Sequence, residues 1–374
     1  MKWSWRLGSI AGIALYVHAT FVLLLAWIAL IQYRGSGSAI AALSGVIFVL
    51  AIFATVVLHE LGHALSARRY GIRTRDITLL PIGGVARLES MPKEPRQELI
   101  VALAGPAVNV VIAALIYAWL MATGGIPSIV DTALLGPGFL DRTFLARLLA
   151  VNIWLVLFNM IPAFPMDGGR VLRALLAMRS GEFAKATETA ARVGKFFALL
   201  FGIVGLFVIG NPFLVLIALF VWLGAAAEAA AVQTSAMLDG VSIRQLMITD
   251  VETLAPGEPL SRPVRLILDG FQQDFPVLEG GTIRGMLTRN SLLKALAERG
   301  ENTPVSDVMQ REFKQATPFE SADVALARLK ECGCHSMPVV NEGKLLGVLT
   351  MDNVGEYVMV QAALRGAKSD FVAA

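Results

Sequence analysis

The stretch VVLHELGHALSARRYG, residues 56–71, decides the fold because it places two histidines and a glutamate at the end of an apolar run. Residues 35–58 carry no charged side chain, and His59 follows them directly. A run of this length approaches or exceeds the roughly 20 apolar residues that cross a bilayer core. Ionisable side chains at such a position are functional candidates by default.

The composition indicates an integral membrane protein through the first two thirds of the chain. Of 374 residues, 56% are hydrophobic and only 16% are charged, whereas soluble proteins carry about a quarter charged residues. The uncharged runs comprise residues 7–33, 35–58, 99–130, 148–166 and 196–227. Gly210-Asn211-Pro212 marks a turn inside the last run. We therefore predict an α-helical polytopic membrane protein with about six transmembrane helices, two of them short and joined at this turn, and with five spans as the alternative.

Lysine and arginine gather on one side of these runs, after the second and the fourth. By the positive-inside rule, both termini and the His59 end of the second run are expected in the cytoplasm of a multi-pass cell-membrane protein. The formal net charge of +3 needs no nucleic-acid partner to explain it.

After about residue 235 the chain changes to a soluble character and repeats itself. Five landmark pairs recur at an offset of 62: Met247 and Met309, Pro256 and Pro318, Pro276 and Pro338, Gly285 and Gly347, Thr288 and Thr350. A fixed offset indicates two copies of one α/β unit. The predicted domains are residues 1–234 in the membrane, followed by copies at 241–300 and 303–362.

The opening stretch has the spacing of a metal site. In a helix, His59 and His63 lie on one face and can bind one ion, while Glu60 can reach its bound water. Zinc lowers the pKa of that water, and the carboxylate takes its proton as the water attacks a carbonyl. Because HExxH is short and occurs by chance, a helix end with incidental histidines is the alternative.

A third ligand is offered by FNMIPAFPMDGGR, residues 158–170. Pro162 and Pro165 are expected to break the helix, and the glycines after Asp167 would let the backbone approach another helix closely. An isolated aspartate at membrane depth is costly unless it is paired, and Zn²⁺ held by two histidines is a partner of the right sign.

The HELGH run at 59–63, the NxxPxxPxDGG run at 159–169 and the repeated tail together resemble the site-2 protease family of intramembrane zinc metalloproteases, in its CBS-containing branch. The resemblance implies regulated intramembrane proteolysis, in which peptide bonds within or near the transmembrane segment of single-span membrane proteins are hydrolysed. It also implies roles for five residues: zinc ligands His59, His63 and Asp167, general base Glu60, and Asn159 as a group that helps to hold the substrate carbonyl.

The repeats at 241–362 resemble a tandem pair of CBS domains, which often bind adenosine nucleotides. The resemblance places ATP, ADP or AMP against Thr350 and Asp352 in one half-site and against Thr288 and Asn290 in the other. Asp352 can accept hydrogen bonds from both ribose hydroxyls, whereas the Asn290 amide has one accepting oxygen. We therefore expect the first of these half-sites to dominate. The alternative is that the pair only forms a homodimer or caps the membrane part.

The segment ITLLPIGGVARLES, residues 77–90, resembles the family's membrane-associated β-hairpin. Residues 77–80 are β-prone, and Pro81 with the two glycines marks a turn. An open strand edge there could pair with an unwound substrate. A plain re-entrant loop is the competing interpretation.

Other polar residues receive structural interpretations. His18 is placed in the middle of the first span, as an interior residue or a lining of the substrate path. Asn109 is interpreted as a helix-packing residue. Cys332 and Cys334, in CGCH, are interpreted as structural, and two cysteines in a reducing cytosol argue against a disulfide.

Two other classes of function compete with the protease. One is a catalytically silent membrane scaffold, and the other is a CBS-gated metal or ion transporter. Glu60 separates them from the protease, because a transport site needs ligands but no general base.

Overall fold

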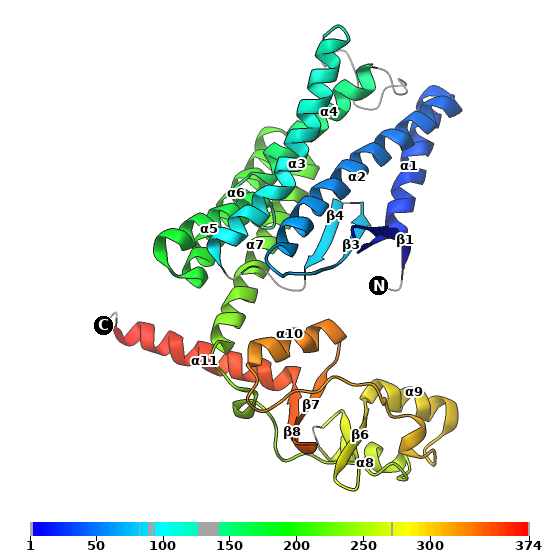
Figure 1. Ribbon diagram of the computed structural model, residues 1–374, viewed down its shortest axis with the longest axis vertical. Coiled ribbons are helices and arrows are strands. Elements are labelled where there is room, and N and C mark those ends of the chain that lie inside the picture. The colour runs from blue at the N-terminus through cyan, green and yellow to red at the C-terminus, as the bar shows by residue number, and fades with distance from the viewer. Residues whose placement is uncertain are drawn as a thin grey trace. The chain divides into compact units, whose positions relative to one another are not determined.

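The computed structural model describes residues 3–81, 83–88, 92, 94–125, 142–270 and 272–372. The chain divides into two compact units, Met1–Ala230 and Ala231–Ala374 (Figure 1). Helix α7 (Pro212–Leu238) runs through this division. We therefore keep the predicted domain limits at residues 234, 241, 300, 303 and 362 as a proposal.

The first unit begins with a sheet of which the sequence predicted only the second hairpin, as one of two alternatives. Strands β1 (Ser4–Ile10), β2 (Ile13–His18), β3 (Thr74–Leu80) and β4 (Gly83–Leu88) lie in the order β1-β2-β3-β4. Strand β2 pairs with β3 in parallel, and the other pairs are antiparallel. Residues 77–90 were expected to form either a hairpin or a loop, and the structure has the hairpin.

The apolar run at residues 7–33 is therefore only partly a membrane span. Ala11 and Gly12 both have positive φ, 52° and 83°, as the two-residue turn of a twisted hairpin requires. Helix α1 (Ala19–Ser36) starts only after this hairpin. The placement of His18 in mid-span was wrong: its side chain caps α1 by accepting a hydrogen bond from the backbone N–H of Thr20 at 3.3 Å.

The remaining helices of this unit are mostly long and apolar, except for the shorter, amphipathic α5. They are α2 (Ala39–Arg68), α3 (Pro95–Ala122), α4 (Arg142–Asn159), α5 (Asp167–Ser180), α6 (Phe183–Ile203) with a π-helical turn at Val204–Val208, and α7. In the described residues, five helices are long and apolar enough to cross a membrane, and Thr143–Asn159 is a shorter apolar helix. The turn at residues 210–212 does separate two helices, but these are not short, since they span Phe183–Val208 and Pro212–Leu238.

Helix α2 packs its apolar face on the sheet. Val49, Phe53, Val57 and Leu61 recur every fourth residue and form one cluster with buried side chains of β2 and β3. Phe21 of α1 meets Phe53 edge to face, with ring centroids 4.5 Å apart. The last turns of α2, which carry the HELGH motif, are thus fixed against the sheet.

The second unit confirms the predicted repeat. Helix α8 (Ser261–Asp269), β5 (Phe275–Glu279), β6 (Thr282–Leu287) and α9 (Arg289–Arg299) form the first copy. Helix α10 (Ala322–Cys332), β7 (Ser336–Asn341), β8 (Lys344–Thr350) and α11 (Met351–Val372) form the second. The strands make one antiparallel sheet in the order β5-β6-β8-β7.

The two copies also exchange their opening segments. Ile248 of the first copy bridges to Val348 of the second, and Gln310 of the second bridges to Met286 of the first. These two contacts are related by the same offset of 62 that relates the sequences. Each copy therefore completes the other, and the pair folds as one body.

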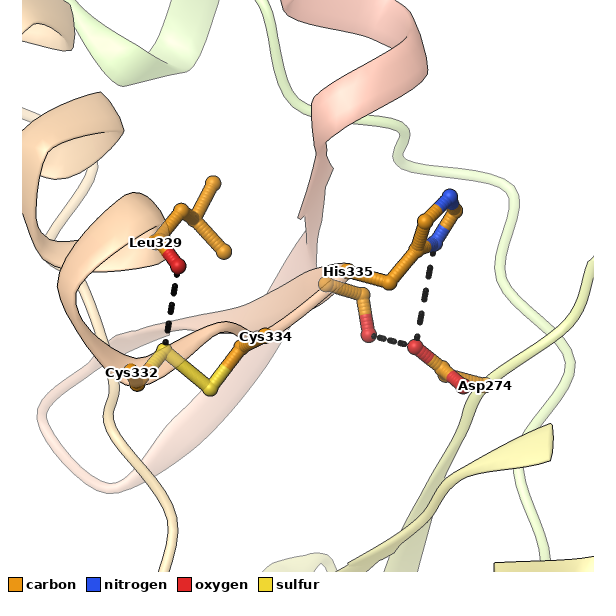
Figure 2. The surroundings of a disulfide bond; sticks show 6 residues. Asp274, Leu329, Cys332, Cys334 and His335 are labelled. Carbon is orange, nitrogen blue, oxygen red and sulfur yellow. Dashed lines mark hydrogen bonds and ion pairs between the residues drawn. A yellow bond between two sulfur atoms is a disulfide. The ribbon is translucent and has the colours of Figure 1, made fainter. Parts of the chain in front are cut away.

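The expectation that the cysteines stay unpaired is corrected by the structure. Cys332, at the end of α10, and Cys334, before β7, are joined by a disulfide (Figure 2). The turn from α10 into β7 brings these two Cα atoms to 5.2 Å, within the range that a disulfide spans.

Candidate functional site

The side chains of His59, His63 and Asp167 converge inside the first unit. The two Nε2 atoms lie 3.1 Å apart, and each lies 3.2 Å from Oδ2 of Asp167. All three side chains are buried. Ligands about 2.0–2.1 Å from a tetrahedral zinc would be separated by about 3.3–3.4 Å. The spacing between the three atoms therefore suits one small cation.

The other ring nitrogens of the histidines are held by helix α3. Nδ1 of His63 lies 2.7 Å from the carbonyl oxygen of Val101, and Nδ1 of His59 lies 2.6 Å from Oδ1 of Asn109. A carbonyl oxygen only accepts, so each Nδ1 carries the proton and donates it. Each Nε2 is then left with a lone pair, and both lone pairs point at the carboxylate of Asp167.

This donor set fits a divalent metal. Two lone-pair nitrogens and one carboxylate face one another in a buried space, and the histidines are oriented by outer partners, as metal-binding histidines usually are. Three protein ligands with a fourth position left for water or substrate are typical of catalytic zinc. The chemistry of the residues, rather than the motif alone, supports the metal.

Close contact between α2 and α3 makes the site possible. A Cβ placed on Gly105 of α3 would overlap the ring of His63. A Cβ on Gly62 of α2 would lie only 2.7 Å from the carbonyl oxygen of Ala104. Glycine at both positions lets the helices approach until His63 reaches the Val101 carbonyl.

Asp167 reaches the site because helix α4 ends before it and α5 begins on it. Residues 160–166 are irregular, as Pro162 and Pro165 predicted. A Cβ on Gly168 would overlap the backbone of Met160 and Ile161, so this glycine approaches the preceding turn rather than another helix. Arg173, further along α5, pairs with Glu98 of α3 and Glu228 of α7.

Glu60 lies beside strand β4. A Cβ on Gly84 would come within 3.0 Å of Cγ of both Glu60 and the neighbouring Val56 side chain (its Cγ1). The carboxyl-bearing side chain therefore packs against the backbone of β4, at a point where no side chain intervenes. Strand β4 is the last in the sheet order, so its outer edge meets no further strand in the described part of the chain.

Two asparagines are linked to His59 by hydrogen bonds, and neither is Asn159, the asparagine that the sequence assigned to the site. Asn159 is the half-buried last residue of α4. Asn109, interpreted as a packing residue, contacts His59 directly. Asn152 of α4 was missed, although its amide lies inside an uncharged run, where a polar side chain is itself a signal. It accepts a hydrogen bond from Asn109 at 2.9 Å.

The second unit contains a cavity of about 1320 Å³ between the two copies. Thr288 and Asn290 line it from the first copy, and Cys334, His335 and Ser336 line it from the second. Four basic side chains line its wall, Arg289, Arg311, Lys314 and Arg328, together with the acidic side chains of Asp274, Glu312 and Glu331. The basic groups offer partners for the anionic part of a ligand.

The two nucleotide-motif threonines are helix caps in the structure. Thr288 accepts from the N–H of Ser291 at 3.3 Å, and Thr350 accepts from the N–H of Asn353 at 3.1 Å. Asp352 pairs with His335 through Oδ2 and Nε2, 3.2 Å apart. Its carboxylate is therefore engaged by a side chain that itself lines the cavity.

Asp274 links the two copies beside the disulfide (Figure 2). Its carboxylate accepts from Ser336 Oγ at 2.6 Å and from the N–H of Arg289 at 2.9 Å. Residues 274 and 336 differ by the repeat offset of 62, so equivalent positions of the two copies contact each other. The imidazole of His335 lies on the same carboxylate, with Nδ1 at 3.9 Å.

Comparison with known proteins agrees with both parts of the chain. The model of peptidase family M50 matches residues 47–136 and 124–201, and the CBS domain model matches residues 243–298 and 305–359. A zinc metalloprotease of Methanocaldococcus jannaschii is 32% identical over 354 residues, which is 95% of this chain and 96% of that protein.

Two further similarities each cover part of this chain. Stage IV sporulation protein FB of Bacillus subtilis is 30% identical over 162 residues, 43% of this chain and 51% of that protein. The solved site-2 protease from Methanocaldococcus jannaschii is 35% identical and covers 61% of this chain and 95% of its own, with a TM-score of 0.43. On the family model and the full-length relative, this chain belongs to peptidase family M50, the site-2 protease family of zinc metalloproteases, in the branch that carries tandem CBS domains.

Proposed function

We propose that this metalloprotease hydrolyses peptide bonds within or near the transmembrane segment of single-span membrane proteins. In this proposal His59, His63 and Asp167 hold one Zn²⁺, Glu60 is the general base, and Asn159 helps to hold the substrate carbonyl. The convergence of three buried ligand atoms carries the assignment of the metal. The adjacent Glu60 supplies a general base, which a transport site or a silent scaffold would not need.

The chain's own residues account for each proton movement. Zn²⁺ bound at the site supplies a Lewis acid that polarises the scissile carbonyl and acidifies water. Glu60, one residue from His59, accepts the proton of the attacking water and returns it to the leaving amine. Asn159 offers amide N–H groups to the oxyanion that develops on the carbonyl.

Strand β4 gives a reason for the class of substrate. A helical peptide hides its carbonyls in intrahelical hydrogen bonds, so the substrate must unwind before it is cut. The outer edge of β4, beside Glu60, meets no further strand in the described residues, so an extended segment can pair with it there. A substrate whose span contains Gly or Pro unwinds at lower cost.

The test is cleavage of a tagged single-span protein by the purified full-length chain in detergent, with metal content measured on the same sample. The test substrate carries Gly-Pro within its span, and the matched control carries Leu-Leu there. We expect one zinc per chain and cleavage of the first substrate in preference to the second. Equal cleavage of a soluble, unstructured peptide would contradict the proposed substrate class.

We further propose that the CBS pair binds an adenosine nucleotide and so regulates proteolysis. The 1320 Å³ cavity supports this, since four basic side chains in its wall can pair with phosphate groups. Regulation requires that the nucleotide bind one state of the protease more tightly than another, since equal affinity for both states shifts no equilibrium.

The proposal also includes homodimerisation through the CBS pair, residence in the cell membrane, and cytoplasmic termini. Reporter fusions at each terminus test the orientation.

A further inference from the structure

A chain of three hydrogen bonds leads from His59 to a backbone carbonyl two helices away. Nδ1 of His59 lies 2.6 Å from Oδ1 of Asn109, and Nδ2 of Asn109 donates to Oδ1 of Asn152 at 2.9 Å. Nδ2 of Asn152 in turn donates to the carbonyl oxygen of Leu148 at 2.9 Å. Both asparagine side chains are fully buried.

The direction of every bond in this chain is fixed by its last member. The Leu148 carbonyl can only accept, so Asn152 must turn its NH₂ toward it and its oxygen toward Asn109. Asn109 must then donate to that oxygen, which turns its own oxygen toward His59. His59 can satisfy this oxygen only by donating from Nδ1. Its Nε2 is consequently unprotonated and directed at Asp167.

We propose that Asn109 and Asn152 are positioning residues that fix the tautomer and the ring orientation of His59. The proposal rests on the assignment of His59 as a metal ligand. A lone asparagine at residue 109 could turn its amide over and present NH₂ to the imidazole, which would favour the tautomer with a proton on Nε2. Asn152 prevents this reversal, because a reversed Asn109 amide would turn its oxygen toward Oδ1 of Asn152 and leave two acceptors facing each other in a buried site.

The two histidines are thus oriented by different devices. His63 donates directly to the Val101 carbonyl, a group that cannot be reversed. His59 donates to a side chain that could be reversed, and a second side chain removes that freedom. The Asn109 amide is neutral, whereas the carboxylate that often orients a metal-binding histidine is negatively charged. The site therefore carries one negative charge fewer.

The first measurement is zinc affinity of the full-length chain, by competition with a chelating indicator. Asn109→Leu and Asn152→Leu should each weaken binding by about 10–100-fold, the usual effect of losing an outer partner. Asn109→Asp should lose at most a few-fold, because either carboxylate oxygen accepts from Nδ1. Thr55→Val is the matched control: Thr55 is buried on α2 one turn before His59, and its hydroxyl donates to the Ile52 carbonyl of its own helix at 2.7 Å.

The second measurement reads the tautomer without metal or activity. The chain has only four histidines, so ¹⁵N-histidine labelling gives few signals, and His59→Ala assigns one of them. In the metal-free chain, His59 should show a protonated Nδ1. Asn152→Leu should shift that signal toward a mixture of tautomers, whereas Thr55→Val should leave it unchanged.

These outcomes distinguish the positioning role of Asn109 and Asn152 from the metal site itself. If His59→Ala binds zinc as tightly as the parent chain, the proposed metal site is wrong. Suppose that His59→Ala loses zinc but Asn152→Leu keeps both the zinc affinity of the parent chain and the tautomer of His59. Only the positioning role of the two asparagines is then overturned. The positioning role would also be overturned if Asn109→Asp lost as much zinc affinity as Asn109→Leu. The hydrogen bond that residue 109 accepts from Nδ1 of His59 would then not explain the zinc affinity.

Discussion

Arg173 of α5 and Glu98 of α3 form an ion pair that is buried on both sides, and the same guanidinium lies 2.5 Å from Glu228 of α7. The rings of Phe164 and Phe183 flank it, with the guanidinium carbon 5.0 and 4.8 Å from their centroids. Arg173 stands six residues after Asp167 on the same helix. The pair therefore fixes the helix that presents the aspartate to the histidines.

Arg173→Met should destabilise the membrane unit by about 3–5 kcal/mol, because the Glu98 carboxylate is left buried without its partner. Thermal unfolding in detergent measures this. Lys185→Met is the control, since its pair with Glu182 is exposed and such pairs contribute little. The double variant Glu98→Leu with Arg173→Met should recover part of the loss. A double variant less stable than Arg173→Met would contradict this account.

Glu60→Gln should abolish proteolysis while zinc stays bound, because the base is lost and the three ligands remain. Elemental analysis and a cleavage assay on one preparation check both halves. Normal cleavage by the variant would remove Glu60 from the mechanism. Loss of zinc would instead place Glu60 among the ligands.

Asp167→Ala should lower zinc occupancy together with activity, since two histidines alone hold the ion weakly. The measurement is zinc per chain after dialysis against a weak chelator, with Glu60→Gln beside it. Unchanged zinc in the aspartate variant would mean that the third ligand lies elsewhere in the chain.

Gly105→Ala should reduce zinc affinity, because the added methyl group overlaps the His63 ring and must displace it. Gly202→Ala is a matched control in another apolar helix, where the nearest atom to the new Cβ is 3.7 Å away. Chelator competition gives the comparison. Equal effects of the two substitutions would show that the contact with His63 is not the cause.

Nucleotide binding should respond unequally to changes in the two half-sites. The sequence favours Asp352→Ala as the more damaging variant, since a carboxylate accepts from both ribose hydroxyls. The cavity, however, is lined by Asn290, and Asp352 is paired with His335. Calorimetry with ATP, ADP and AMP on the full-length chain decides. A larger loss in Asn290→Ala would refute the ranking from sequence and place the ligand in the cavity.

The sequence predicted the chemistry of the site better than its surroundings. His59, His63 and Asp167 are marked by their spacing and by ionisable side chains in apolar runs. Both signals can be read without knowing how the helices pack. The first hairpin of the sheet was missed because residues 7–18 are uncharged, and a charge count does not distinguish a strand from a span. Asn109 and Asn152 escaped assignment because their role depends on which carbonyl each amide meets. Only three-dimensional contacts supply that.

The parallel pairing of β2 with β3, which joins Ala14 to Asp76 and Val17 to Leu79, constrains the biogenesis of the protein. Strand β2 leaves the ribosome before α1 and α2, and β3 leaves after them. The first hairpin must therefore keep one edge unpaired at the membrane surface until both helices have entered the bilayer. Two crossings bring the chain back to its starting side, where β3 closes that edge. Completion of the sheet therefore requires that α1 and α2 return the chain to the side on which β2 lies.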